Sequence, residues 1–362
     1  MANQNPLIGL LKSRFKNNKD DFPSYGKVDY NSLFEHSNHY LANNVHNNVV
    51  IRARIADKGG YLTDHGTEHI LMVMRRAADL LKMDTDNGDL KTALLSYEVF
   101  LLLMAIDFHD VGNNYGREGH ETRIREQMDE IPVLAELNDL EKNIITQIAS
   151  VHGGTVDSDK DTIGKVLPEE PLEFGGKTYR PQLLAAILRL ADELSDESVR
   201  ADTYGLKQNA IPPESQIYHK YAQRLGSVKI APTEKKVKLR FTLYAEDVLN
   251  QFGKTKEKNG KIKTVYLLDE IHDRTKKTFM EMIYCMRFIR RFIPFELNAL
   301  DVKISVYNKG SSQAPYREMA YTMKERGYPE ISKVSLRELC DNYEEITGKE
   351  LKTQCKAAFN PS

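Results

Sequence analysis

Histidine and aspartate side chains at a few positions of this chain could together bind metal ions. The sequence contains only ten histidines, and four of them lie at or near the ends of apolar segments, beside a break or an acidic residue. Two aspartates occupy similar positions. The candidate ligands are His69, His109, Asp110, His120, His152 and Asp192. Imidazoles and carboxylates without a thiolate suit Mn, Fe, Co, Ni or Mg better than a structural zinc site.

The doublet His109-Asp110 is the strongest local anomaly. It follows the most apolar run of the chain, Val99–Ile106, almost directly. Burial of ionisable groups is costly unless they are paired or bound to a metal. Asp192 stands in a similar context, because it follows the apolar positions 187, 188, 190 and 191. Both observations predict a metal centre inside a helical bundle.

The elements that would carry these residues are mostly helices. Apolar residues recur at three- and four-residue steps from Ile70 to Leu81, which predicts an amphipathic helix. The nearly all-apolar segment over about 90–108 is expected to form a central helix. Further helices are expected at about 118–131, 138–152 and 181–194, the last opened by a proline, with a loop over 155–180.

After about residue 205 the pattern changes to one that includes strands. Alternation with a period of two predicts strands at 227–231, 236–244 and 301–307. We expect a basic loop over Lys254–Lys263, a long helix over about 266–292 and two weak helices after 312. The sequence therefore predicts a mainly α protein with three parts: an N-terminal extension (1–47), a helical metal-binding domain (48–205) and a smaller α+β domain (206–362).

Composition and charge exclude several classes of protein. Lys and Arg number 51 against 52 Asp and Glu, a net charge of -1, which speaks against extended nucleic-acid binding. Val99–Ile106 is too short to cross a bilayer, and the N-terminus lacks the features of a signal peptide. The three cysteines form neither a disulfide framework nor a zinc motif, so we expect a soluble cytoplasmic protein.

The order of these motifs resembles the HD-domain superfamily of metal-dependent phosphohydrolases. His69 is followed by a valine four residues on, as is the family's first histidine, and His109-Asp110-Val-Gly resembles its doublet. Arg189-Leu-Ala-Asp192 resembles its final aspartate motif. The resemblance covers roughly residues 50–205. The tract Arg189–Leu194, with Arg200 downstream and a small strand-containing domain after it, also resembles HD domains found in bacterial conflict and defence systems.

The resemblance implies two divalent metal ions and hydrolysis of a phosphoester or phosphoanhydride. It implies that Asp110 bridges the ions, that His69, His109 and Asp192 hold the first ion, and that His120 and His152 complete the second. His65 competes with His69 as the ligand, and otherwise is a general acid, a substrate contact or simply exposed. Asp107 and Asp64 are candidates to orient imidazoles. Candidate phosphate-binding residues are Lys58, Arg117, Arg123 and Arg200.

The substrate class expected from this resemblance is nucleotides, as (deoxy)nucleoside tri- or monophosphates. Asn113-Asn114-Tyr115-Gly116 stands where deoxynucleotide triphosphohydrolases of the superfamily carry a longer motif with phenylalanine and glycine. Two alternatives therefore stay open: a phosphodiesterase for cyclic mono- or oligonucleotides, and a nucleotide-sensing or partner-binding module without turnover. Homo-oligomerisation also stays open. The remaining histidines, His36, His39, His46, His219 and His272, lack a partner pattern and are expected to be structural or on the surface.

Overall fold

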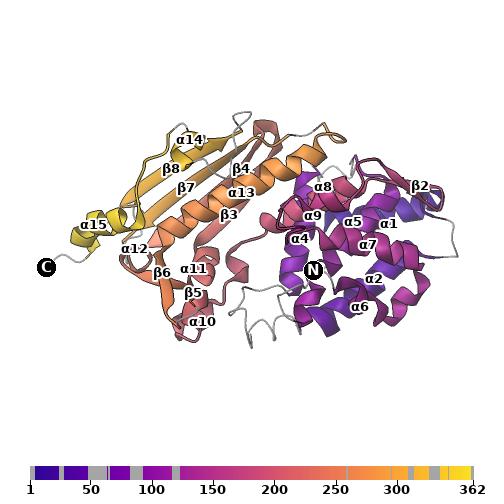
Figure 1. The fold of residues 1–362 in the computed structure, drawn as a ribbon, viewed down its shortest axis with the longest axis horizontal. Helices are drawn as coiled ribbons and strands as arrows, with labels where there is room; N and C mark the ends of the chain where they lie inside the picture. Colours follow the sequence, from indigo (N-terminus) through magenta and orange to yellow (C-terminus); the bar gives the residue numbers. More distant parts are fainter. Residues whose placement is uncertain are drawn as a thin grey trace. The chain divides into compact units, whose positions relative to one another are not determined.

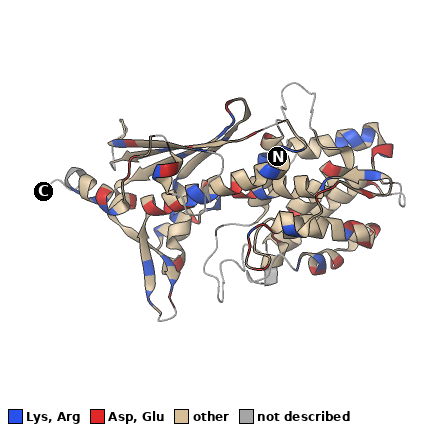
Figure 2. Ribbon diagram, turned by 45° about the horizontal axis from the view of Figure 1, so that its top comes forward, with Lys and Arg blue, Asp and Glu red and all other residues tan. Residues whose placement is uncertain are grey.

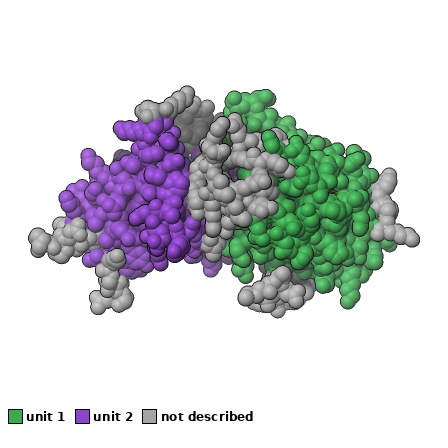
Figure 3. Space-filling model, turned by 90° about the horizontal axis from the view of Figure 1, so that it is seen from below, with its two compact units in different colours: residues 1–59, 65–195, 285–294 green, residues 60–64, 196–284, 295–362 purple. Residues whose placement is uncertain are grey.

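The computed structural model describes residues 5–23, 28–47, 63, 66–81, 93–115, 123–257, 260–294, 296–308, 314–325, 335–340 and 342–359. The chain divides into two compact units (Figure 3). Unit 1 contains residues 1–59, 65–195 and 285–294; unit 2 contains residues 60–64, 196–284 and 295–362. The fold is mainly α with a smaller α+β part, as the sequence predicted. The domain boundaries expected near residues 48 and 206 stay a prediction.

Unit 1 is built around one helix, α5 (Ser96–Phe108), whose residues are all buried (Figure 1). Its nearly uniform apolar composition explains this position, because a helix that is apolar all round can be buried on every side. Five helices pack against it. They are α1 (Pro6–Asn17), α2 (Tyr30–Leu41), α4 (Thr67–Leu80), α7 (Asp139–Ser150) and α9 (Pro181–Glu193).

The surrounding helices begin where their sequences place capping residues. Asn138 and Glu141 form a capping box at the start of α7, and a proline occupies the first turn of α1 and of α9. Smaller elements complete the unit: η2 (Lys19–Asp21), the π-helix η3 (Ala42–His46), η4 (Val111–Tyr115), α6 (Ile124–Asp129), η6 (Pro132–Glu136) and α8 (Thr162–Val166). The hairpin of β1 (Leu172–Phe174) and β2 (Lys177–Tyr179) lies in the segment predicted as a loop, so that prediction was wrong there.

Unit 2 contains a four-stranded sheet in the order β3-β4-β7-β8. Its strands are β3 (Leu225–Ala231), β4 (Lys236–Tyr244), β7 (Ala299–Tyr307) and β8 (Arg317–Lys324). β4 and β7 run parallel, whereas the two outer pairs are antiparallel. Alternate residues of β4 and β7 are buried, which is the period-two pattern that predicted them. β8 was not predicted.

Outside this sheet, unit 2 contains several helices and a hairpin of two further strands. The helices are η7 (Ser198–Arg200), α10 (Thr203–Lys207), η8 (Pro213–Ser215), α11 (Gln216–Arg224), η9 (Pro232–Glu234), α12 (Ala245–Leu249), α13 (Leu267–Ile289), α14 (Leu336–Leu339) and α15 (Gly348–Phe359). β5 (Gln251–Lys256) pairs with β6 (Ile262–Tyr266), so both ends of the predicted basic loop, 254–256 and 262–263, form strands instead. The charge of Lys254 is paired there, since its Nζ lies 2.7 Å from Oε2 of the buried Glu270.

Charged residues of both signs are interspersed over the described parts of both units (Figure 2), in keeping with the net charge of -1. No helix within the described residues is both long enough and apolar enough to span a lipid bilayer.

Candidate metal centre

The site begins where α5 ends. His109 and Asp110 follow Phe108, and both side chains are buried. Nδ1 of His109 donates a hydrogen bond to the carbonyl oxygen of Ile106, one turn back, at 2.7 Å. Because the carbonyl can only accept, the proton of a neutral His109 ring is held on Nδ1 and the lone pair on Nε2. The helix end thus presents an imidazole nitrogen in the orientation that a metal ligand requires.

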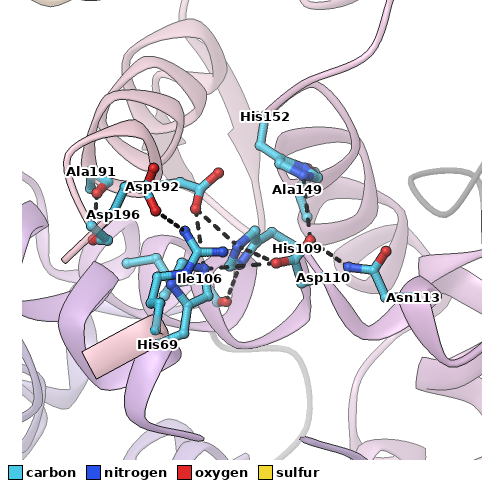
Figure 4. Close-up of polar contacts among 12 residues, drawn as sticks. His69, Ile106, His109, Asp110, Asn113, Ala149, His152, Ala191, Asp192 and Asp196 are labelled. Atoms are coloured by element: carbon cyan, nitrogen blue, oxygen red, sulfur yellow. Dashed lines mark hydrogen bonds and ion pairs between the residues drawn. The ribbon is translucent and has the colours of Figure 1, made fainter. Parts of the chain in front are cut away.

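Side chains from three helices converge on that nitrogen (Figure 4). His69 comes from the first turn of α4 and Asp192 from the last turn of α9, and Nε2 of His69 lies 3.2 Å from Oδ1 of Asp192. Nε2 of His109 lies 3.3 Å from Oδ2 of Asp110 and 3.7 Å from Oδ1 of Asp192. Nε2 of His69 lies 3.7 Å from Oδ2 of Asp110. Donor atoms about 2.0–2.2 Å from one cation would be separated by such distances.

His152 approaches Asp110 from the other side. It follows α7, and its Nδ1 donates to the carbonyl oxygen of Ala149 at 2.7 Å, as His109 does to Ile106. Its Nε2 lies 3.8 Å from Oδ1 of Asp110. Asp110 therefore has one oxygen facing His69 and His109 and the other facing His152. Asn113 holds the second oxygen by donating a hydrogen bond of 2.9 Å.

The donor set fits a divalent cation. Ligand atoms of His69, His109 and Asp110 all lie within 4.8 Å of one another, and the three residues are buried. Nε2 of His109 has no aligned hydrogen-bond partner, and a buried imidazole nitrogen in that state is costly unless something binds it. A cation would satisfy this nitrogen and offset the carboxylate charges.

Electrostatics in the metal-free protein show how strongly these groups interact. Burial alone would lower the pKa of His109, but the carboxylates of Asp110 and Asp192 outweigh it and hold that pKa well above its usual value. Burial likewise raises the pKa of Asp192, but His109 and His69 hold that pKa well below its usual value. A positive charge is therefore favoured between these carboxylates, and either a proton or a cation can supply it.

The other residues singled out in the sequence fall elsewhere. Both carboxylate oxygens of Asp107 accept hydrogen bonds from Nδ2 of Asn38, at 2.9 and 3.0 Å. Backbone carbonyls orient the rings of His109 and His152 instead, because each ring follows a helix end whose last carbonyls need donors. Arg123 is exposed, just before α6. Lys58, Asp64, His65, Arg117 and His120 lie outside the described residues.

Arg200 has a partner within unit 2. The side chain is buried, and Nη1 lies 3.6 Å from Oδ1 of Asp196, four residues earlier in the chain. Its assignment to substrate phosphate stays a prediction.

A comparison with known protein families identifies the family of this chain. The family model described as HD-CE matches residues 59–277, more than half of the chain. The protein belongs to the HD-CE family. The resemblance to HD domains drawn from His69, His109-Asp110 and Asp192 is thereby confirmed. A search of curated proteins found no match.

The HD-CE match covers parts of both units. It contains every candidate ligand and continues through β3–β6 into α13. The HD-type domain and the His-His-Asp cluster together suggest a metal-dependent phosphohydrolase.

Proposed function

We propose that this protein hydrolyses the phosphoester or phosphoanhydride bonds of nucleotides, with (deoxy)nucleoside tri- or monophosphates as its substrates. The observation that carries the proposal is the cluster of His69, His109, Asp110 and Asp192 at the buried end of α5, in which Nε2 of each histidine lies 3.2–3.7 Å from an oxygen of each aspartate. A site with these donors at these distances suits a hard or borderline cation.

Each ligand has a role in this proposal. His69, His109 and Asp192 would hold one divalent ion. Asp110 would be shared with a second ion, which is supported by its two oxygens facing different histidines, and His152 with His120 would complete that second site. A divalent cation supplies a lowered pKa for bound water and neutralises charge on phosphoryl oxygens.

The protein's own groups keep this chemistry in place. Ile106 and Ala149 fix the ring orientation of His109 and His152 through their carbonyl oxygens, and Asn113 fixes the carboxylate of Asp110. Burial of His69, His109 and Asp110 limits competing solvent, which strengthens electrostatic interactions with a substrate phosphate. His65, four residues before His69, is proposed as the general acid toward the leaving group.

A substrate screen tests the proposal. The purified protein is stripped of metal, reloaded separately with Mn²⁺, Mg²⁺, Co²⁺ or Ni²⁺, and incubated with nucleoside mono-, di- and triphosphates and with cyclic mono- and oligonucleotides. Chromatography then identifies the products. We expect release of phosphate or triphosphate by the wild-type protein and none by His109→Ala or Asp110→Ala.

Two outcomes contradict the proposal. A linear product from a cyclic nucleotide, with no hydrolysis of the others, identifies a phosphodiesterase. Binding of nucleotides without turnover under every metal identifies a sensing module.

A further inference from the structure

A fourth buried histidine among the described residues of unit 1, His46, has no explanation within the fold. Its side chain is 1% exposed, and neither Nδ1 nor Nε2 has a hydrogen-bond partner among the described residues. Buried polar groups without partners are rare and cost free energy, so each requires a reason. Nothing in the sequence around His46 indicated one.

His46 lies in an unusual turn of the backbone that side-chain hydrogen bonds stabilise. His46 is the last residue of η3, a π-helix that continues from α2. The widened turn is supported by Asn43 and Asn44, whose Nδ2 atoms donate to the carbonyl oxygens of His39 and Tyr40 at 2.8 and 2.9 Å. Single π-turns inside helices are frequent at functional sites, because they change the direction in which a side chain points.

His46 lies close to the metal centre. η3 packs against η4, the short helix that directly follows Asp110. The charges of His109 and Asp110 both act on the His46 ring, whose pKa is lowered to about 4. Burial is the main cause, His109 adds to the lowering, and Asp110 opposes it. The ring is therefore neutral at ordinary pH, and one of its nitrogens carries a hydrogen that it can donate.

His46 forms no hydrogen bond or ion pair with the ligands among the described residues. Its nitrogens make no ion pair with a described carboxylate, whereas His69, His109 and His152 each do. A buried polar group near the ligands that forms no hydrogen bond with a described residue is suited to bind what the ligands hold. In a phosphohydrolase that is the phosphoryl group.

We propose that His46 is a substrate-binding residue of this centre, and that its neutral imidazole donates a hydrogen bond to a phosphoryl oxygen. This inference rests on the proposed function. It assigns to the N-terminal extension a part in recognition of the phosphate. The unsatisfied ring is then a cost that the metal-free fold bears in exchange for phosphate binding.

Paired measurements of stability and phosphate binding test the proposal. His46→Leu removes the unpartnered nitrogens, so the melting temperature of the metal-free protein stays the same or rises, because no hydrogen bond is lost. Binding of inorganic phosphate to the Mn²⁺-loaded protein, followed by calorimetry and by broadening of the phosphate ³¹P resonance, weakens roughly 10- to 100-fold, the usual effect of losing a hydrogen bond to a charged group. His46→Gln, which keeps an N–H donor, recovers part of the affinity. The exposed His36→Leu is the control and changes neither quantity.

Three results would overturn the proposal. Loss of a bound Mn²⁺ in His46→Leu would make His46 a metal ligand. A lower melting temperature with unchanged phosphate affinity would make it an ordinary core residue. Unchanged phosphate affinity with unchanged stability would leave it with no role in recognition. Neither measurement requires turnover, so a wild-type protein that binds phosphate through His46 but hydrolyses no nucleotide would contradict the proposed function alone.

Discussion

Nε2 of His69 lies 3.2 Å from Oδ1 of Asp192, although the two residues come from different helices, the first turn of α4 and the last turn of α9. α4 and α9 pack directly against each other. The contact brings the first and last candidate ligands of the sequence together beside the end of α5. Metal binding should therefore hold three helices of unit 1, α4, α5 and α9, together.

Removal of one ligand should weaken metal binding and the stabilisation that it gives. We expect His69→Ala and Asp192→Ala to reduce Mn²⁺ affinity at least about 100-fold, since residues that only support a ligand already account for about 10- to 100-fold. Added Mn²⁺ should raise the melting temperature of the wild-type protein and leave that of both variants nearly unchanged. Calorimetry and thermal unfolding measure the two effects, with His36→Ala as the exposed control. Equal stabilisation of all four proteins by Mn²⁺ would contradict the assignment.

Stability should depend on pH with opposite sign in the metal-free and metal-loaded protein. The pKa of His109 in the metal-free fold is held well above 6.5, so the protonated ring stabilises the fold below pH 6.5 and this contribution is lost as the pH rises toward the folded-state pKa. Metal binding needs the neutral ring, so stabilisation by a metal grows over the same range. Melting curves with and without Ni²⁺ at a series of pH values above 6.5 check this. Asp192→Asn should weaken the pH dependence of the melting temperature of the metal-free protein. If the melting temperature changes with pH in the same way with and without Ni²⁺, protonation of His109 and metal binding are not coupled.

A hydrogen-bonded chain behind His152 should contribute to stability. Nη1 of the buried Arg189 donates to Oγ1 of Thr162 at 2.9 Å, and Thr162 donates to the carbonyl oxygen of Val151 at 3.0 Å. Thr162→Val removes both bonds at a buried position, so we expect a loss of about 1–3 kcal/mol in the free energy of unfolding. Urea denaturation measures it. Thr178→Val, at an exposed position of β2, is the matched control and should have a much smaller effect.

The start of α5 depends on a buried ion pair. Glu98 is fully buried, and its Oε1 accepts hydrogen bonds from the backbone nitrogen and Nε of Arg180, at 2.9 and 2.7 Å. Arg180→Leu leaves this carboxylate without its partner, which should cost about 3–5 kcal/mol of stability. The exposed pair of Arg337 and Glu345 offers the comparison, since Arg337→Leu should cost about 0–1 kcal/mol. Similar losses of stability in the two variants would show that the buried ion pair contributes no more to stability than the exposed one.

The helical part of the fold and the core of the site could be predicted because both follow local patterns. The apolar run that became α5 and the polar doublet that ends it are visible in the sequence, as are the stripes of α4 and α9. His69, His109, Asp110 and Asp192 were chosen on those patterns, and the structure places their side chains within a few ångströms of one another.

The features that were missed depend on contacts between distant segments. β5 has only Gly253 buried, and β6 has no buried residue, so their pairing leaves little hydrophobic pattern to detect. β8 does alternate, with Met319, Tyr321 and Met323 buried, and that signal could have predicted a strand. For His46 the available signal was the stripe of Leu33, Phe34, Leu41 and Val45, which ends next to it and indicates a buried position.

The complete enclosure of α5 has a consequence for how proteins of this family can diversify. A helix that touches neighbours on every side tolerates few substitutions, since any change in volume shifts the atoms around it. The doublet at its end is therefore attached to a helix in which changes of side-chain volume are costly. Changes of ligand preference are better tolerated in the segments around α5, which can vary while His109 and Asp110 keep their positions.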